Sequence, residues 1–497
     1  MPTESPTRPS EIILSRDESL DLPSTKTDSP ALKDKGKIRA EILHGPLSKS
    51  VLMLAYPSVA TMLLQTTNGF LDRFFVGHLE AGPEAQAAVT VSNSLMFALM
   101  AAGMAISVGT TALVARSIGE GDIDRAKKAT EQSLALTLML SFLIAIPMWL
   151  LRMPILEAFG LQAGARELAA QYLGITILGM PMLFAMLTMN GAFRGMGDTV
   201  RPFYVTLGAN LVHAGLNWLL IFGNWGFPKM GLPGGATALA VSQAVSTLLY
   251  VLFLRRSLLA GVRFFSPIDW EWTRRIARIG LPAAGQQLVR VGSMLTLQIL
   301  VARMGAGDAA VAALGVGLVS ESIAFMPGFG YSIAASAFVG QNLGANQPKR
   351  ASAGAWSATW QAVAIMSVMG VMFYFFAEPF ARFFIPHLDG ESATRAAQVE
   401  ETVKLTASYL RVAACSEPFL ALGMVLTGAL QGAGETISPT LITVVTMVFL
   451  RVPLAYFLLA GGYGTEGAWW AMSISTIAQG IATAYLFRQG GWQRTRV

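Results

Sequence analysis

The 497-residue chain is too apolar to be a soluble protein. Hydrophobic residues make up 53% of it and charged residues 13%, with a mean hydropathy of +0.51, whereas soluble proteins carry about 25% charged residues. Its net charge of +6 does not indicate nucleic-acid binding, because the basic residues lie in short segments between apolar stretches. The single cysteine, Cys415, excludes an internal disulfide and a thiolate metal cluster, so we expect no metal site and no resident cofactor.

In chain order, the polar residues 1–44 predict a disordered cytoplasmic tail without a cleavable signal. The apolar segments that follow are each long enough to cross roughly 30 Å of hydrocarbon. They predict an all-α integral membrane protein with an N-lobe of six helices (45–255), an interlobe cytoplasmic loop (256–272), a C-lobe of six helices (273–488) and a cytoplasmic C-terminus (489–497). The twelve predicted transmembrane helices lie at about 47–76, 87–116, 126–150, 165–193, 200–223, 233–254, 273–302, 310–340, 351–377, 402–430, 437–460 and 466–487.

Lys and Arg residues gather in alternate loops of this arrangement. The positive-inside rule then places both termini in the cytoplasm, which agrees with an even number of helices. We expect a multi-pass protein of the cell (inner or plasma) membrane that contacts the lipid bilayer and is monomeric. The basic groups are Lys33, Lys35, Lys37, Arg39 and Lys49; Arg116, Arg125, Lys127 and Lys128; Arg255, Arg256, Arg263, Arg274, Arg275 and Arg278; and Arg488, Arg494 and Arg496.

An internal repeat relates the two predicted lobes. A shift of 225 residues places Pro57 on Pro282 and Gly119 on Gly344, and a shift of 237 residues later places Pro181 on Pro418. Each unit has an even number of helices, so both copies face the same way and the pseudo-two-fold axis runs along the membrane normal. A substrate site between the two lobes follows from this symmetry.

The same residues resemble a known family. Pro57, Asp72 and Val76-Gly77 in the first helix, together with Phe193–Thr199 and its repeat Leu430–Thr436, are similar to motifs of the multidrug and toxic compound extrusion (MATE) transporters. The resemblance implies a V-shaped bundle of two lobes that exchanges external Na⁺ or H⁺ for cytoplasmic organic cations or other amphipathic drugs, without ATP. It also suggests that Pro57 acts as a hinge.

Asp72 is the strongest candidate for a coupling residue. An ionised carboxylate far inside an apolar helix costs at least ~2.5 kcal/mol, so such a residue is rarely kept without a function. Gln65 and Asn68 lie seven and four residues earlier and share its helical face, where they are candidates for the substrate cavity. The alternative is that Asp72 only pairs with a neighbour such as Arg73 near the outer interface.

The fifth helix carries a second polar stripe, Asn210, His213 and Asn217. The resemblance implies that the Asp of helix 1 works with an Asn of helix 4 and with an Asn and an Asp of helix 5; the matching positions are Asp72, Asn190, His213 and Asn217. His213 and Asn217 depart from that pattern, which leaves one carboxylate. An Asp–His pair favours H⁺ over Na⁺ as the coupling ion. Interhelical hydrogen bonding alone would also explain His213 and the asparagines.

The C-lobe does not repeat this cluster. Its corresponding positions are Leu297, Thr427, Leu450 and Leu454. The C-lobe instead offers Gln287, Arg290, Glu321 and Glu417 as cavity candidates, although Glu417 could simply pair with Arg451 and Glu321 with Arg290. Pro57 and Pro282 each remove one helical hydrogen bond, so both are predicted to kink their helices as hinges.

These features predict a secondary active antiporter that exports cationic or amphipathic drugs or metabolites by alternating access of two lobes. A flippase for a lipid-linked precursor is the alternative within transport. A membrane-embedded enzyme has less support, because no cluster of catalytic residues is recognisable at one depth.

Overall fold

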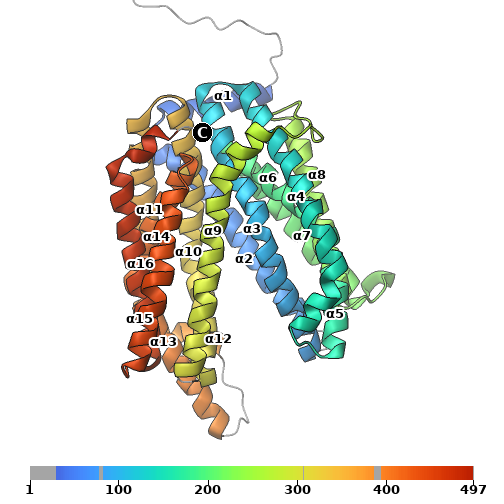
Figure 1. Ribbon diagram of the computed structural model, residues 1–497, viewed down its shortest axis with the longest axis vertical. Coiled ribbons are helices and arrows are strands. Elements are labelled where there is room, and N and C mark those ends of the chain that lie inside the picture. Colours follow the sequence, from blue (N-terminus) through green and yellow to red (C-terminus); the bar gives the residue numbers. More distant parts are fainter. Residues whose placement is uncertain (1–29, 78–81, 306, 386–392, 496–497) are drawn as a thin grey trace, which may run out of the picture.

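The computed structural model describes residues 30–77, 82–305, 307–385 and 393–495, and every regular element within these ranges is a helix. Figure 1 shows two helical lobes that meet at the end carrying α1 (Pro30–His44) and diverge toward the opposite end. We call the end with α1 the closed end. The N-lobe contains α2 (Leu47–Gly77), α3 (Gly82–Glu120), α4 (Ile123–Ala158), α5 (Ala163–Leu178), α6 (Met180–Gly195), α7 (Val200–Phe222), η1 (Asn224–Gly226) and α8 (Leu232–Arg255). The C-lobe contains α9 (Trp270–Met304), α10 (Gly307–Gly344), α11 (Pro348–Phe375), α12 (Ala377–Phe384), α13 (Ala393–Gly432), α14 (Ile437–Val444), η2 (Val445–Arg451), α15 (Val452–Ala460), α16 (Gly464–Gln489) and η3 (Gly491–Arg494).

Most of the predicted transmembrane helices are long and apolar in the structure. Within the described ranges nine helices could cross a membrane by length and hydropathy, and the bent pair α5–α6 forms a tenth span. The remaining two predicted helices correspond to α9 and α16, which are 35 and 26 residues long but are not among those ten. The hydropathy of the helices therefore supports ten of the twelve predicted spans, in an all-α membrane fold.

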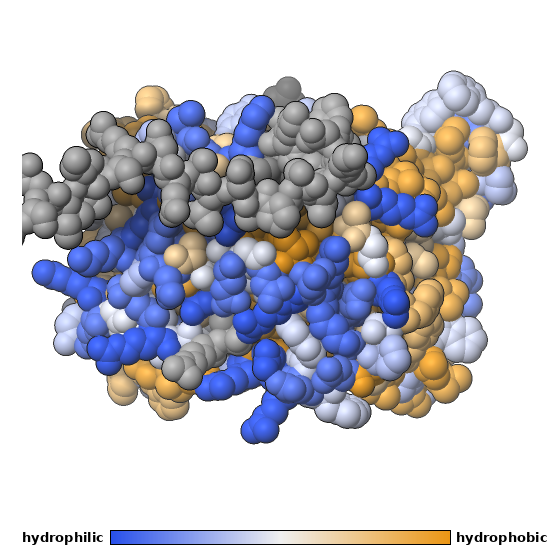
Figure 2. All heavy atoms as spheres, turned by 90° about the horizontal axis from the view of Figure 1, so that it is seen from above, coloured by the Kyte–Doolittle hydropathy of each residue, from blue (hydrophilic) through white to orange (hydrophobic). Residues whose placement is uncertain are grey.

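Hydrophilic and apolar residues are separated as a membrane requires. Figure 2 looks onto the closed end, where hydrophilic side chains spread over much of the face and hydrophobic side chains lie at its flanks. On α4, the large side chains of Phe142, Leu143, Ile146 and Leu150 are exposed, as expected for a surface that contacts lipid.

The predicted disorder of residues 1–44 is wrong for the last part of that segment. Residues 30–44 form α1, in which Ile42 and Leu43 are buried. The guanidinium of Arg39 donates a hydrogen bond to the carbonyl of Gly119 at 3.1 Å, and Arg350 donates to the carbonyl of Ile42 at 3.1 Å. These contacts tie α1 to both lobes, and they are long-range contacts that a polar composition does not reveal. Residues 1–29 lie outside the described ranges.

The first helix of the N-lobe packs on both lobes. Before Pro57, Val51 and Leu54 of α2 belong to the same buried cluster as Ala334 of α10 in the C-lobe. After Pro57, α2 runs along α7 of its own lobe, where Asn210 donates to the Leu64 carbonyl at 2.7 Å. The contacts of α2 with α10 of the C-lobe continue after Pro57, where Thr66 donates to the Met326 sulfur at 3.4 Å, so this part of α2 lies between the two lobes.

The first helix of the C-lobe also packs on both lobes. Before Pro282, Ile276 and Ile279 of α9 are buried in the cluster of the N-lobe. After Pro282, Gln286 donates to the Thr443 hydroxyl at 2.8 Å within the C-lobe. Both prolines remain inside uninterrupted helices. Their matched positions follow from the parallel repeat.

At the closed end α3 and α10 cross backbone to backbone. A Cβ atom on Gly119 would overlap the backbone carbonyl of Gln341, and a Cβ on Gly344 would overlap that of Arg116. The two contacts are related by the repeat, because a shift of 225 residues carries Gly119 to Gly344 and Arg116 to Gln341. Small residues allow helices to approach this closely in a membrane, so this glycine crossing holds the closed end together.

The repeat is broken in the fourth helix of each lobe. In the N-lobe this span bends by 48° between α5 and α6, at Gly179 and just before Pro181. The repeat positions in the C-lobe are Ser416 and Pro418, and α13 passes through both as one 40-residue helix. Proline is present in both lobes, so the bend accompanies the glycine.

Candidate functional site

The polar residues of α2 and α7 form one connected group, which we call the Asp72 cluster. The Nε2 atom of His213 lies 3.0 Å from Oδ1 of Asp72, and the Asn217 amide donates to the same oxygen at 3.2 Å. The Asp72 side chain is 41% exposed, whereas those of His213 and Asn217 are buried. The cluster thus presents a half-exposed carboxylate on a buried support of hydrogen-bond donors.

The contacts of His213 are satisfied by one protonation state. Its Nδ1 lies 3.5 Å from the Asn68 amide nitrogen, which can only donate, so Nδ1 accepts. Nε2 then carries the proton and donates to the Asp72 carboxylate. A neutral imidazole that donates through Nε2 and accepts at Nδ1 satisfies both contacts.

Several oxygens of this region have no hydrogen-bond partner. The amide oxygens of Asn68, Asn190 and Asn217 are buried and unsatisfied among the described residues. Buried polar atoms of this kind are normally satisfied by water or an ion. Tyr172 of α5 is also buried and lies within electrostatic range of Asp72, a neighbour that the sequence pattern did not indicate.

The structure does not unite every predicted residue of the N-lobe. No hydrogen bond links Asn190 to Asp72 in the described part of the chain. Asn190 is buried on α6, the helix that precedes α7. Gln65 is exposed, and Asn210 bonds to the α2 backbone, which is a packing contact. The side chain of Arg73 lies outside the described residues, so its predicted pairing with Asp72 stays untested.

The C-lobe contains a second buried group, formed by Glu321 of α10 with Tyr409 and Glu417 of α13. The Tyr409 hydroxyl donates a hydrogen bond to Glu321. Glu417 is 1% exposed, and neither of its carboxylate oxygens has a hydrogen-bond partner among the residues that the structure describes. The charge of Glu321 acts directly on Glu417, so two carboxylates share this interior.

The two ion pairs that were the alternatives to a cavity role in the C-lobe are not formed among the described residues. Arg451 donates to the hydroxyls of Ser475 at 2.8 Å and Thr476 at 3.2 Å rather than to Glu417. Glu321 accepts from Tyr409 rather than from Arg290. Arg451 is the last residue of η2, a π-helical segment, and its side chain reaches α16.

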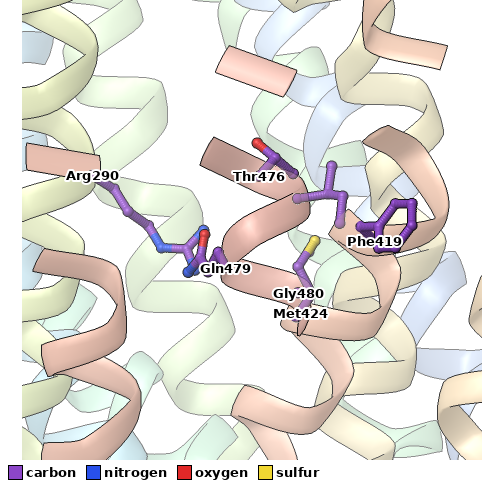
Figure 3. Close-up of a pocket in the computed structure, with 8 residues that line it drawn as sticks. Arg290, Phe419, Met424, Thr476, Gln479 and Gly480 are labelled. Atoms are coloured by element: carbon purple, nitrogen blue, oxygen red, sulfur yellow. The ribbon is translucent and has the colours of Figure 1, made fainter. Parts of the chain in front are cut away.

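Arg290 points into a narrow pocket between α9, α13 and α16. Figure 3 shows its side chain extending toward Gln479, with Thr476, Phe419 and Gly480 as further lining residues. Arg290 is half-buried and lies within electrostatic range of Arg451, which carries the same charge. Gln287, its predicted companion, is half-buried and makes no hydrogen bond among the described residues.

The fold and these sites define the class of protein. Two parallel helical repeats that meet at one end, with ionisable side chains buried inside the spans, are the design of a secondary membrane transporter rather than of an enzyme. The MatE family model matches residues 57–219 and 282–457, one segment in each lobe. The chain therefore belongs to the MatE family, the MATE transporters.

Individual relatives match along most of the chain. A probable multidrug resistance protein NorM of Thermotoga maritima is 28% identical over 456 residues, which cover 91% of this chain and 94% of the relative. An FAD transporter of Shewanella oneidensis is 26% identical over 455 residues, covering 90% and 96%. The outward-facing conformation of a multidrug resistance MATE family transporter superposes with a TM-score of 0.82 at 25% identity, covering 90% of this chain and 97% of that one.

Proposed function

We propose that this protein is a secondary active antiporter that exports small cationic or amphipathic molecules from the cytoplasm in exchange for protons. Relatives along the whole chain are named multidrug resistance proteins, and another is named an FAD transporter, which favours export of drugs or metabolites over a flippase. Two lobes that close at one end and diverge at the other support transport by alternating access.

The observation that carries the proposal is the contact between His213 and Asp72. The carboxylate is half exposed, so ions can reach it, while the imidazole that supports it is buried. Both groups gain or lose protons, and both hydrogen-bond to asparagine amides. A proton bound here changes the charge of the α2–α7 contact, which is the kind of local change that shifts a two-state transporter.

Protons are the preferred coupling ion over Na⁺. Sodium requires several oxygen ligands with compensating negative charge, and the Asp72 cluster contains one carboxylate. His213 also occupies the position beside Oδ1 at 3.0 Å. The unsatisfied amide oxygens of Asn68 and Asn217 are also ligands that Na⁺ could use, so the experiment tests both ions.

We further propose that the closed end faces the cytoplasm and that the protein resides in the cell membrane as a monomer. The basic connections between α3 and α4 and between α8 and α9 lie at this end, as the positive-inside rule requires. The diverging end then faces outward, in keeping with the outward-facing relative. Pro57, which lies on α2 between the buried contacts of Val51 and Leu54 at the closed end and the Asp72 cluster, is the proposed hinge.

The decisive experiment measures ethidium transport in proteoliposomes under a proton gradient or a sodium gradient, each imposed alone. Wild type is expected to respond to the proton gradient, and Asp72→Asn to lose that response. Asp124→Asn, which changes a side chain that is 96% exposed, is the matched control and is expected to behave as wild type. Transport by Asp72→Asn at the wild-type rate under both gradients would refute the coupling role.

A further inference from the structure

A small pocket lies between the lobes on the pseudo-two-fold axis. Its volume is about 80 Å³, and its walls come from α3 and α6 of the N-lobe and α10 and α13 of the C-lobe. Four pairs of lining residues are related by the internal repeat, which places the axis through the pocket. The pairs are Ser107 with Ser332, Val108 with Ile333, Thr111 with Ser336, and Arg194 with Gln431.

Arg194 breaks the symmetry of this pocket and is its only charged lining residue. Among the described residues its guanidinium makes no hydrogen bond and no ion pair, although the side chain is half-buried. The acidic residue closest in sequence, Asp198, pairs with Arg201 at 3.0 Å. Arg194 lies in the last turn of α6, and its electrostatic neighbour is the buried Tyr250. An arginine held in the fold without a carboxylate partner is a candidate for binding an anion.

The neutral groups of the pocket decide what such a site can hold. The hydroxyls of Ser107 and Ser332 donate to the carbonyls of Leu187 at 2.7 Å and Met424 at 2.9 Å, so they offer only acceptor lone pairs. Ser336 makes no hydrogen bond in the described part of the chain.

Gln431 donates one N–H to the Gln286 oxygen at 3.3 Å and keeps its second N–H. The free donors are therefore Arg194 from the N-lobe, and Ser336 and Gln431 from the C-lobe.

We propose that this pocket binds the anionic group, a carboxylate or a phosphate, of an amphipathic substrate. A guanidinium with two further donors matches such a group in charge and in number of hydrogen bonds. About 80 Å³ holds a carboxylate or phosphate but not a whole drug-sized molecule, so the apolar part of the substrate lies outside the pocket. Because the donors come from both lobes, the bound group bridges them.

This inference rests on the proposed export function and defines a class within its amphipathic substrates, the molecules that carry a negative group. Cations such as ethidium need no contact with this pocket. It adds a second recognition element at the interlobe axis, separate from the Asp72 cluster. The repeat also explains the choice of residues: a second arginine in place of Gln431 would set two like charges on one axis, whereas glutamine keeps a donor without repulsion.

The test compares two fluorescent probes that share one ring system, neutral riboflavin and its phosphate ester FMN. Binding is measured by fluorescence anisotropy on the full-length protein in phosphatidylcholine nanodiscs. Wild type is expected to bind FMN about tenfold or more tightly than riboflavin, because hydrogen bonds to charged groups have about that strength. Arg194→Gln, which copies the C-lobe residue, is expected to lose this preference and keep riboflavin binding, whereas Arg194→Lys keeps most of it.

The matched control is Arg201→Gln, which removes a nearby arginine that already has a partner and is expected to leave the FMN preference unchanged. Equal binding of the two probes by wild type, including binding of neither, overturns the proposal, and so does an FMN preference that survives in Arg194→Gln. A second arm uses nanodiscs with phosphatidylglycerol. If that lipid competes with FMN in wild type but not in Arg194→Gln, the pocket belongs to a lipid phosphate and the substrate assignment fails. The ethidium assay is scored separately, so failure of ion coupling leaves this result standing.

Discussion

Replacing Gly344 by alanine is predicted to open the closed end. The new methyl group would overlap the Arg116 carbonyl across the glycine crossing, where the neighbouring atoms are backbone and cannot rotate away. Overpacking of this kind costs about 1–3 kcal/mol. The helical preference of alanine over glycine acts equally when the lobes are together or apart, so it cancels. The population with a separated closed end should rise roughly 5- to 150-fold, which is the same free energy expressed as a ratio.

Distances between spin labels at the closed end measure this change directly. Cys415 is the only native cysteine, so labels can be placed through Asp124→Cys in the N-lobe and Lys349→Cys in the C-lobe of a Cys415→Ser protein. Gly344→Ala should broaden the distance distribution toward longer values. Gly292→Ala is the matched control, because a Cβ there meets no atom within 4 Å. An unchanged distribution in Gly344→Ala, or the same change in Gly292→Ala, would refute the role of the glycine crossing.

Three further predictions follow from contacts in the two lobes. Glu417→Met is expected to raise the free energy of unfolding by about 1–3 kcal/mol in thermal denaturation, because it removes two buried oxygens that have no hydrogen-bond partner among the described residues; a loss of stability would contradict this. Arg350→Ala removes hydrogen bonds to the carbonyls of Ile42 and Gly45 and is expected to speed proteolysis at α1, since each bond to a charged group contributes about 1.5–3 kcal/mol; a cleavage rate equal to wild type would count against α1 as a tether. Pro57→Ala is expected to slow ethidium efflux at unchanged ethidium affinity, and efflux at the wild-type rate would remove the hinge.

The fold was predictable because two simple patterns determine it. Hydropathy gave segments of the right length, and the repeat related residues such as Pro57 and Pro282 that occupy matching positions in the structure. Three features were not accessible in this way. The helix α1 depends on tertiary contacts of Arg39 and Arg350, and the bend at Gly179 depends on a residue that helices often tolerate. The π-helical η2 is mostly apolar, like the α-helices on either side of it.

The candidate site was predictable only where spacing along one helix settles geometry. His213 and Asn217 lie four residues apart on α7, so both can reach the same carboxylate, and both lie within 3.2 Å of Asp72. The C-lobe pairs failed because they required the relative rotation of different helices, which sequence spacing does not contain. Sequence spacing therefore suggested pairs of opposite charge. In the structure Glu321 and Glu417 lie near each other, and Arg451 donates to hydroxyl groups.

The symmetric and the asymmetric features of the two lobes have different roles. The glycine crossing is symmetric, so separating the closed end breaks two equivalent backbone contacts at once, which favours two discrete states over a gradual opening. The ionisable groups are asymmetric: Asp72 corresponds to Leu297, and Arg194 to Gln431. A charge repeated on both sides of the axis would repel its copy inside a medium that screens poorly. A duplicated scaffold can therefore keep its backbone contacts in pairs, whereas a charge at the axis, such as Arg194, is best placed in one lobe.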